Sequence, residues 1–170
     1  DHELTLLNDD IKQMGYMVES SIEQCFIAFE DQDFEKAEGI IRGDRTINDL
    51  ERSIEARCLS LILRQQPVAG DLRVVSSALK VVTDLERIGD HASDIAELIL
   101  RIRGEHIYHV VRHIPGMAMA AREMVRSAID AFISQDITAA KTIEKQDDIV
   151  DELFTKVKND VIDLLKQSAE

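Results

Sequence analysis

Several residue types are scarce in this sequence. It has no tryptophan, 2 prolines and 7 glycines among 170 residues, and aromatic residues make up 4% of it. Few helix-breaking residues argue against a turn-rich fold of many short strands and favour a chain of long helices. No stretch approaches the roughly 18 consecutive apolar residues that a membrane-spanning helix needs, so no such helix is expected.

Basic residues are also few, because 20 Lys and Arg stand against 33 Asp and Glu, for a formal net charge of −13. A nucleic-acid-binding surface needs a basic patch, and no basic stripe is present, so we expect no nucleic-acid partner. The same charge argues against adsorption to anionic lipid and against direct membrane insertion. The two cysteines, Cys25 and Cys58, sit at apolar helix positions. They are expected as buried thiols rather than a disulfide, which is typical of a cytoplasmic protein.

Apolar residues recur at three- and four-residue steps along most of the chain, the spacing that places them on one face of a helix. Asp33 is a suitable N-cap for a second helix. Pro67 interrupts the pattern and can then occupy the first turn of a third helix, for which Gly104 is a plausible end. The pattern predicts an all-α fold of five helices, over residues 3–31, 33–65, 67–103, 113–134 and 136–168. The residues expected to be buried are Cys25, Cys58, Phe29, Leu79 and Ile95.

The helical pattern occurs twice, with an offset of 103 residues. Ala28-Phe29-Glu30-Asp31-Gln32-Asp33 is echoed by Ala131-Phe132-Ile133-Ser134-Gln135-Asp136. This predicts an antiparallel three-helix-bundle repeat, with a first copy at 1–104, a connector at 105–116 and the first two helices of a second copy at 117–170. The second copy is therefore expected to be incomplete, with an apolar face left uncovered, and to form a homodimer or a swapped third layer.

The connector contains three histidines, His106, His109 and His113. Zinc favours imidazole ligands, so a metal site is one interpretation. Without a cysteine or a fixed helical spacing, an ordinary connector is the preferred one.

Four acidic side chains fall on one narrow line of the third helix, at about 100° per residue: Glu86, Asp90, Asp94 and Glu97. Like charges at this spacing repel each other, so something outside the helix should offset the repulsion. The second helix has a similar line of acidic and amide side chains, formed by Asp44, Asn48, Glu51 and Glu55.

Consecutive helices are usually antiparallel neighbours, so the two lines should face each other. Together they supply the oxygen ligands that a hard cation, or a cluster of iron or manganese, requires. The alternative is a solvated face of an acidic protein. His91 lies beside the acidic line of the third helix, and it is either at the edge of a metal site or a plain surface residue. Arg87 is expected to pair with Glu51 or Asp90.

No catalytic constellation is evident in the sequence. Ser76, Ser77 and Ser93 lack a histidine at helical spacing, and the carboxylate pairs lack an apolar pocket that would prepare one of them for acid–base work. The chain is therefore expected not to be an enzyme.

Three segments together resemble the PhoU family of bacterial phosphate-transport accessory and regulatory proteins. They are Gln65-Gln66-Pro67-Val68-Ala69-Gly70-Asp71-Leu72-Arg73, Leu85-Glu86-Arg87-Ile88-Gly89-Asp90-His91 and Ile95-Ala96-Glu97. The resemblance implies two three-helix repeats and a metal cluster, in the family reported with iron or zinc, at an acidic motif that corresponds to Glu86 and Asp90 and again to Asp90 and Asp94. Position 94 is commonly Asn in the family, and Asp94 keeps a ligand oxygen there.

The resemblance also implies a function and partners. Family members are thought to link the ATP-binding subunit of a phosphate ABC transporter to a phosphate-sensing histidine kinase, and to repress signalling when phosphate is ample. We therefore expect a cytoplasmic, non-enzymatic negative regulator of phosphate uptake and homeostasis that binds iron, zinc, manganese or magnesium. The alternatives are a metal-binding or storage bundle without a signalling role and, less favoured, a metal-dependent phosphohydrolase.

Overall fold

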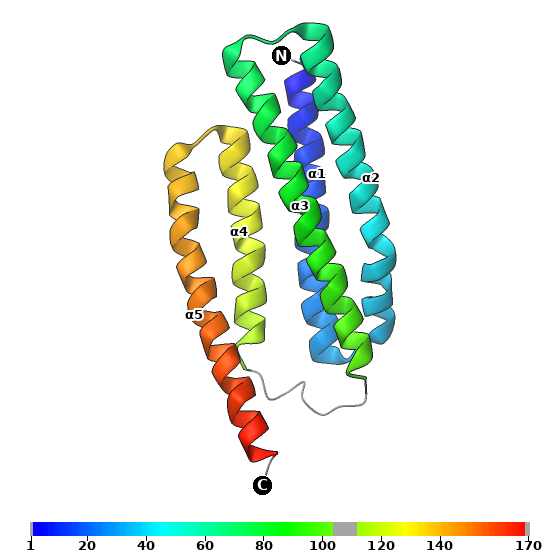
Figure 1. The fold of residues 1–170 in the computed structure, drawn as a ribbon, viewed down its shortest axis with the longest axis vertical. Coiled ribbons are helices and arrows are strands. Elements are labelled where there is room, and N and C mark those ends of the chain that lie inside the picture. The colour runs from blue at the N-terminus through cyan, green and yellow to red at the C-terminus, as the bar shows by residue number, and fades with distance from the viewer. Residues whose placement is uncertain (1, 104–111, 169–170) are drawn as a thin grey trace.

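The computed structural model describes residues 2–103 and 112–168, and within these ranges it contains five helices and no strand (Figure 1). The helices are α1 (His2–Asp31), α2 (Phe34–Gln65), α3 (Ala69–Arg101), α4 (Ile114–Ser134) and α5 (Ile137–Gln167). The all-α prediction is confirmed, and every helix end lies within two residues of its expected position.

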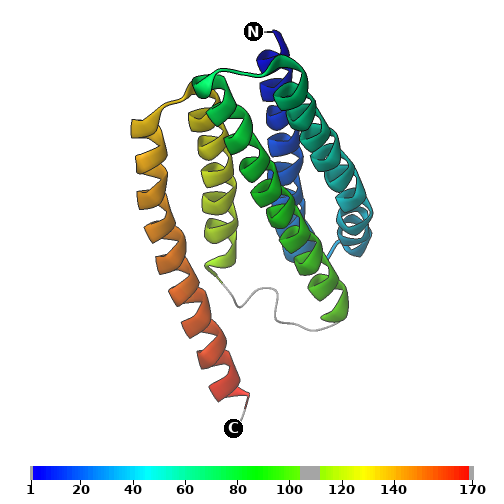
Figure 2. The ribbon, with the colours of Figure 1, turned by 45° about the horizontal axis from the view of Figure 1, so that its top comes forward.

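Helices α1, α2 and α3 form an antiparallel bundle in which each helix contacts the other two. Helix α4 packs on α1 from outside this bundle, and α5 packs on α4 (Figures 1 and 2). Because α2 and α3 run side by side for most of their length, the two acidic lines of the sequence lie on neighbouring helices.

The core of the bundle is aliphatic and fully buried along the inner faces of α1, α2 and α3. Its largest members are Leu7, Ile11, Met14, Val18, Ile54, Val75, Val82 and Ile99. Cys25 and Cys58 are buried free thiols, as predicted. Phe29 and Leu79 are only half-buried and pack against the core from its edge.

The prediction that Ile95 is buried was wrong, because its side chain is 49% exposed. The inner line of α3 at this level consists of Ala92, Ala96 and Ile99, which are all buried. At about 100° per residue, Ile95 lies about 60° from Ala92 and about 100° from Ala96, which places it at the edge of that line and not on it.

The two repeats share the same turn geometry at positions 103 residues apart. Asp33 caps α2 by accepting a hydrogen bond from the Lys36 amide at 3.0 Å, and Asp136 caps α5 by accepting one from the Ala139 amide at 2.9 Å. The residue before each cap has a positive φ, 54° at Gln32 and 57° at Gln135. The sequence repeat is thus also a structural repeat at this turn.

The start of α3 differs slightly from expectation. Pro67 precedes the helix instead of occupying its first turn, because Gln66 turns the chain with a positive φ of 42° and Val68 is the N-cap. The predicted end at Gly104 lies outside the described residues, and α3 ends at Arg101.

Helix α5 contains no buried residue and, within the described ranges, contacts only α4. Its exposed apolar side chains are Ile137, Ile149, Phe154, Val161, Ile162 and Leu165. The predicted uncovered face is therefore present, and the homodimer stays a prediction. None of the described helices combines the length and the apolar character needed to cross a membrane.

Candidate functional site

The two acidic lines meet at the interface between α2 and α3, beside Gly89 of α3. Gly89 permits a close approach of the two helices, since a Cβ atom at that position would lie 3.3 Å from Ile47 Cδ1 and 3.7 Å from Asp44 Oδ1. The carboxyl groups of Asp44 on α2 and Asp90 on α3 contact each other across the interface. The sequence analysis overlooked Gly89, although a glycine inside an acidic helical motif is a signal of close backbone approach.

Asp44 is half-buried, and burial raises the pKa of its carboxyl group above the ordinary value. The negative charge of Asp90 raises the pKa further, whereas the amide of Asn48 lowers it. Asp44 Oδ1 and Asn48 Oδ1 are both buried and receive no hydrogen bond from any residue that the structure describes. Buried oxygens without a donor are costly, so these two acceptors fit a ligand that supplies positive charge.

Glu86 extends the acidic contacts along α3. A hydrogen bond with Asp90 raises the pKa of Glu86 to about 7, and burial and the charges of Asp90, Glu51 and Asp44 act in the same direction. The pKa of Glu51 is also raised, first by burial and then by Glu55 and Asp90. Three carboxyl groups with raised pKa values favour taking up either protons or a cation.

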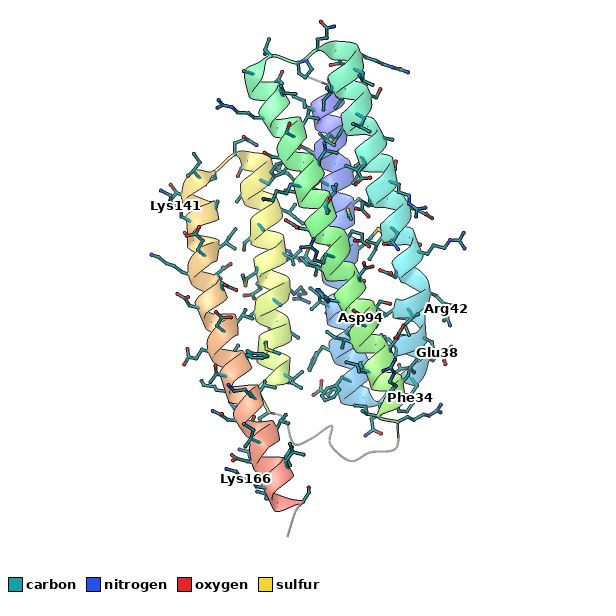
Figure 3. The ribbon with its side chains drawn as sticks, viewed as in Figure 1. Phe34, Glu38, Arg42, Asp94, Lys141 and Lys166 are labelled. Carbon is teal, nitrogen blue, oxygen red and sulfur yellow. The ribbon has the colours of Figure 1, made fainter. Side chains whose placement is uncertain are left out.

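The outer members of the α3 line are less engaged. Asp94 and Glu97 are exposed and lie 3.8 Å from His91 and from Arg101, respectively, on their own helix. Asp94 nevertheless adds to the negative field that raises the pKa of Asp44. In Figure 3, Asp94 lies on the stretch of α3 next to the part of α2 that carries Glu38 and Arg42.

The expected pairing of Arg87 with Glu51 or Asp90 was wrong. Its guanidinium lies 3.9 Å from Asp84, three residues earlier on α3. Both side chains are exposed, and residues three apart on a helix are neighbours, so the local partner is favoured.

The donor set fits a hard or borderline cation. It consists of carboxylates and one amide oxygen, Asn48 Oδ1, which are the ligand types that such ions take. Within residues 2–103 and 112–168, no group of three His, Cys, Asp or Glu side chains is already arranged around one metal position. The carboxyl groups contact each other in pairs, so a cation would have to draw further side chains inward.

The connector histidines supply no alternative among the described residues. His106 and His109 lie outside them. His113 Nδ1 lies 2.8 Å from Asp160 Oδ2, and this hydrogen bond joins the N-cap of α4 to α5.

The family model described as the PhoU domain matches the chain over residues 11–99 and again over 114–170. The chain belongs to the PhoU family. The two matched segments begin 103 residues apart, which is the offset of the internal repeat.

Named relatives align over most of the chain. It is 38% identical over 166 residues to the phosphate-specific transport system accessory protein PhoU homolog of Clostridium acetobutylicum, covering 97% of this chain and 76% of that protein. Its identity to the homolog of the same name from Aquifex aeolicus is 37% over 160 residues, covering 94% of this chain and 72% of that protein.

Solved structures of the family have the same fold. The crystal structure of PhoU from Pseudomonas aeruginosa is similar with a TM-score of 0.88 and 29% identity, covering 98% of this chain and 80% of that one. The phosphate transport system regulatory protein PhoU from Streptococcus pneumoniae has a TM-score of 0.90 and 28% identity, covering 98% and 79%.

Proposed function

We propose that this PhoU-family protein is a cytoplasmic, non-enzymatic regulator of phosphate uptake that represses the phosphate-starvation response when phosphate is ample. The observation that carries the proposal is family membership over nearly the whole chain, with relatives named as accessory proteins of a phosphate-specific transport system. Regulation by docking also suits an elongated helical bundle with a strongly charged surface.

The proposed partners are the ATP-binding subunit of a phosphate ABC transporter and a phosphate-sensing histidine kinase. Both follow from the resemblance to PhoU regulators. A net charge of −13 supports fast, salt-sensitive association with basic surfaces on such partners.

Metal binding at the α2–α3 interface is the second part of the proposal. Two buried oxygens without a donor, Asp44 Oδ1 and Asn48 Oδ1, support it. Iron, zinc, manganese or magnesium would neutralise the carboxylates and link α2 to α3. The residues that would hold the metal are Asp44, Asn48, Glu51, Glu86, Asp90, Asp94 and Glu97.

Pull-down of purified transporter and kinase subunits tests the regulatory role. The tagged protein should capture at least one of the two subunits. A membrane protein unrelated to phosphate transport, which should not be captured, serves as the control prey. Capture of neither subunit, together with stoichiometric metal binding, would favour the alternative of a metal-binding or storage bundle.

The third part of the proposal is a homodimer. The uncovered apolar side chains of α5, with Phe154 58% exposed and Leu165 66% exposed, support association with a second copy. Light scattering at micromolar concentration should give twice the 19.2 kDa chain mass. A monomer mass under these conditions would contradict the proposed homodimer.

A further inference from the structure

The end of the α2–α3 hairpin carries four exposed aliphatic side chains. Leu63 is 77% exposed and Val68 75%, whereas Leu59 and Leu72 are 54% and 39% exposed. We name these four residues the hairpin-tip patch. Scattered apolar residues on a surface need no explanation, but a group at one end of a hairpin marks an interaction site.

The hairpin-tip patch continues the face that carries the acidic side chains. Leu59 follows Glu55 by one helical turn on α2, and Leu72 precedes Asp90 by 18 residues, about five whole turns, on α3. The turn between α2 and α3 lies at one end of the bundle, beyond the connection between α4 and α5 in the view of Figure 1. Among the described residues, helix α4 packs on α1 and not on α2 or α3, and Gly70 and Arg73 at the start of α3 line a hollow together with the connection between α4 and α5.

The charge around the hairpin-tip patch is opposite to that of the protein. Residues 52–80 contain five basic residues and two acidic ones, a charge of +3, whereas the whole chain carries −13 and the remainder therefore −16. The basic residues are Arg52, Arg57, Arg64, Arg73 and Lys80, and the acidic ones are Glu55 and Asp71.

Most of this positive charge is available to a partner. Arg57 is engaged, since its Nε lies 2.9 Å from Asp10 Oδ2 on the α1 side of the bundle. Arg64, Arg73 and Lys80 are exposed and form no ion pair within the part of the chain that the structure describes. An apolar surface edged by free basic side chains fits an apolar segment with carboxylates beside it.

An anionic membrane is less suitable as the occupant. It would attract the three free bases, but it would repel the remaining charge of −16 on the same molecule. A short protein segment, unlike a membrane, can place its carboxylates beside these bases without bringing negative charge close to the rest of the molecule. Charge complementarity therefore favours an acidic, amphipathic segment.

We propose that the hairpin-tip patch is the docking site for an acidic amphipathic helix of a partner protein. Its apolar side chains would pack on Leu59, Leu63, Val68 and Leu72, and its carboxylates would pair with Arg64, Arg73 and Lys80. The inference deepens the proposed function, because it rests on regulation by docking and names the chemistry of the docked segment. It requires neither the metal nor the particular partners named above.

A peptide probe tests the docking site directly. Fluorescence anisotropy with chelator present would compare a labelled amphipathic peptide of Leu and Glu with a matched peptide in which Lys replaces every Glu. The Leu–Glu peptide should bind more tightly than the Leu–Lys peptide, despite the overall charge of −13. Leu63→Ser and Arg73→Glu should each weaken its binding by about tenfold or more.

Matched controls come from the far end of the molecule. Leu98→Ser and Lys166→Glu alter an exposed leucine near the end of α3 and a lysine near the end of α5, both away from the α2–α3 turn (Figure 3). They should leave binding of the Leu–Glu peptide unchanged, and melting curves should show that all four variants fold.

Three results would overturn the proposal. One is equal binding of the Leu–Glu peptide to the wild type and the two tip variants. Another is a loss of binding caused by Leu98→Ser alone, which would place the docking site at the opposite end of α3. The third is co-sedimentation with phosphatidylglycerol vesicles that requires Arg73 when the peptide does not bind, which would identify a membrane surface instead. Capture of transporter or kinase subunits is a separate measurement, so failure of the docking site and failure of the regulatory role remain distinguishable.

Discussion

Glu86 and Asp90 share a hydrogen bond between carboxyl groups one turn apart on α3, and this bond is the largest cause of the raised pKa of Glu86, about 7. With a pKa of about 7, the Glu86 carboxyl group of the metal-free protein binds a proton for about half of the time at neutral pH. A bound cation would take the place of that proton. Proton binding and metal binding are therefore expected to compete at the same carboxyl groups.

The first prediction is that the metal-free protein becomes less stable as pH rises towards 8. The folded protein holds the pKa of Glu86 at about 7, above the ordinary value of 4.5, so the folded state binds this proton more tightly than the unfolded state. The contribution to the free energy of unfolding is complete below pH 4.5 and is lost as pH rises through 7. Urea unfolding in chelator at several pH values measures it. Glu86→Gln should reduce the dependence of the free energy of unfolding on pH. An equally steep pH dependence in this variant would show that Glu86 is not its cause.

The second prediction concerns metal and stability. A cation that binds only the folded arrangement should raise the free energy of unfolding, by about 2.7 kcal/mol at a hundred times its dissociation constant. Asp90→Asn combined with Asp94→Asn should abolish this increment, while the metal-free variant becomes slightly more stable because repulsion is removed. Asp84→Asn, on α3 but outside the site, is the control. Unchanged melting of the wild type with every metal would mean that the acidic face is merely solvated.

The helical architecture could be predicted because it depends on local signals. Apolar periodicity places the five helices, and the side chains of Asp33 and Asp136 mark two helix starts by a short-range hydrogen bond. The facing of the two acidic lines followed from the tendency of consecutive helices to pack as antiparallel neighbours. The contact of Asp44 with Asp90 agrees with that prediction.

The remaining details depend on tertiary packing that periodicity does not encode. The exposure of Ile95 results from the rotation of α3 about its axis, which the small residues Ala92 and Ala96 set by facing the core. The role of Gly89 depends on the close approach of Ile47 from another helix. The pairing of Arg87 with Asp84 is a choice of side-chain rotamer, which the order of residues leaves open.

The third prediction concerns the contact between the two repeats. Gly15 on α1 is buried against Ile129 of α4, and an added side chain there would collide with Ile129. Gly15→Leu should lower the free energy of unfolding by about 1–3 kcal/mol through overpacking, and Ile129→Ala in the same protein should recover part of the loss. Gly70→Leu, at a glycine with open space around it, is the matched control. Equal effects at the two glycines would contradict the packing argument.

The fourth prediction is that both thiols are unreactive in the folded protein. Burial raises the pKa of Cys25 to about 12 and that of Cys58 to about 11. Because the thiolate is the reactive form, almost none is present at pH 8. A chromogenic disulfide reagent should detect no thiol in the native protein and both after denaturation. Rapid labelling of either cysteine without unfolding would show that its surroundings open.

The last prediction links metal occupancy to partner binding. Each divalent ion cancels two negative charges, so loading the α2–α3 interface changes the local field by several charges. A partner surface that contacts the α2–α3 interface lies within the screening length of about 8 Å at physiological salt and is therefore exposed to this change. In the metal-free protein the acidic side chains should attract a basic partner surface, and metal loading should weaken that attraction. Titration of the transporter or kinase subunit against loaded and chelated protein, at one ionic strength, should show weaker binding by the loaded form. The difference should shrink in high salt and vanish in Asp90→Asn combined with Asp94→Asn. Equal affinities of the two wild-type forms would mean that the metal has a structural role only.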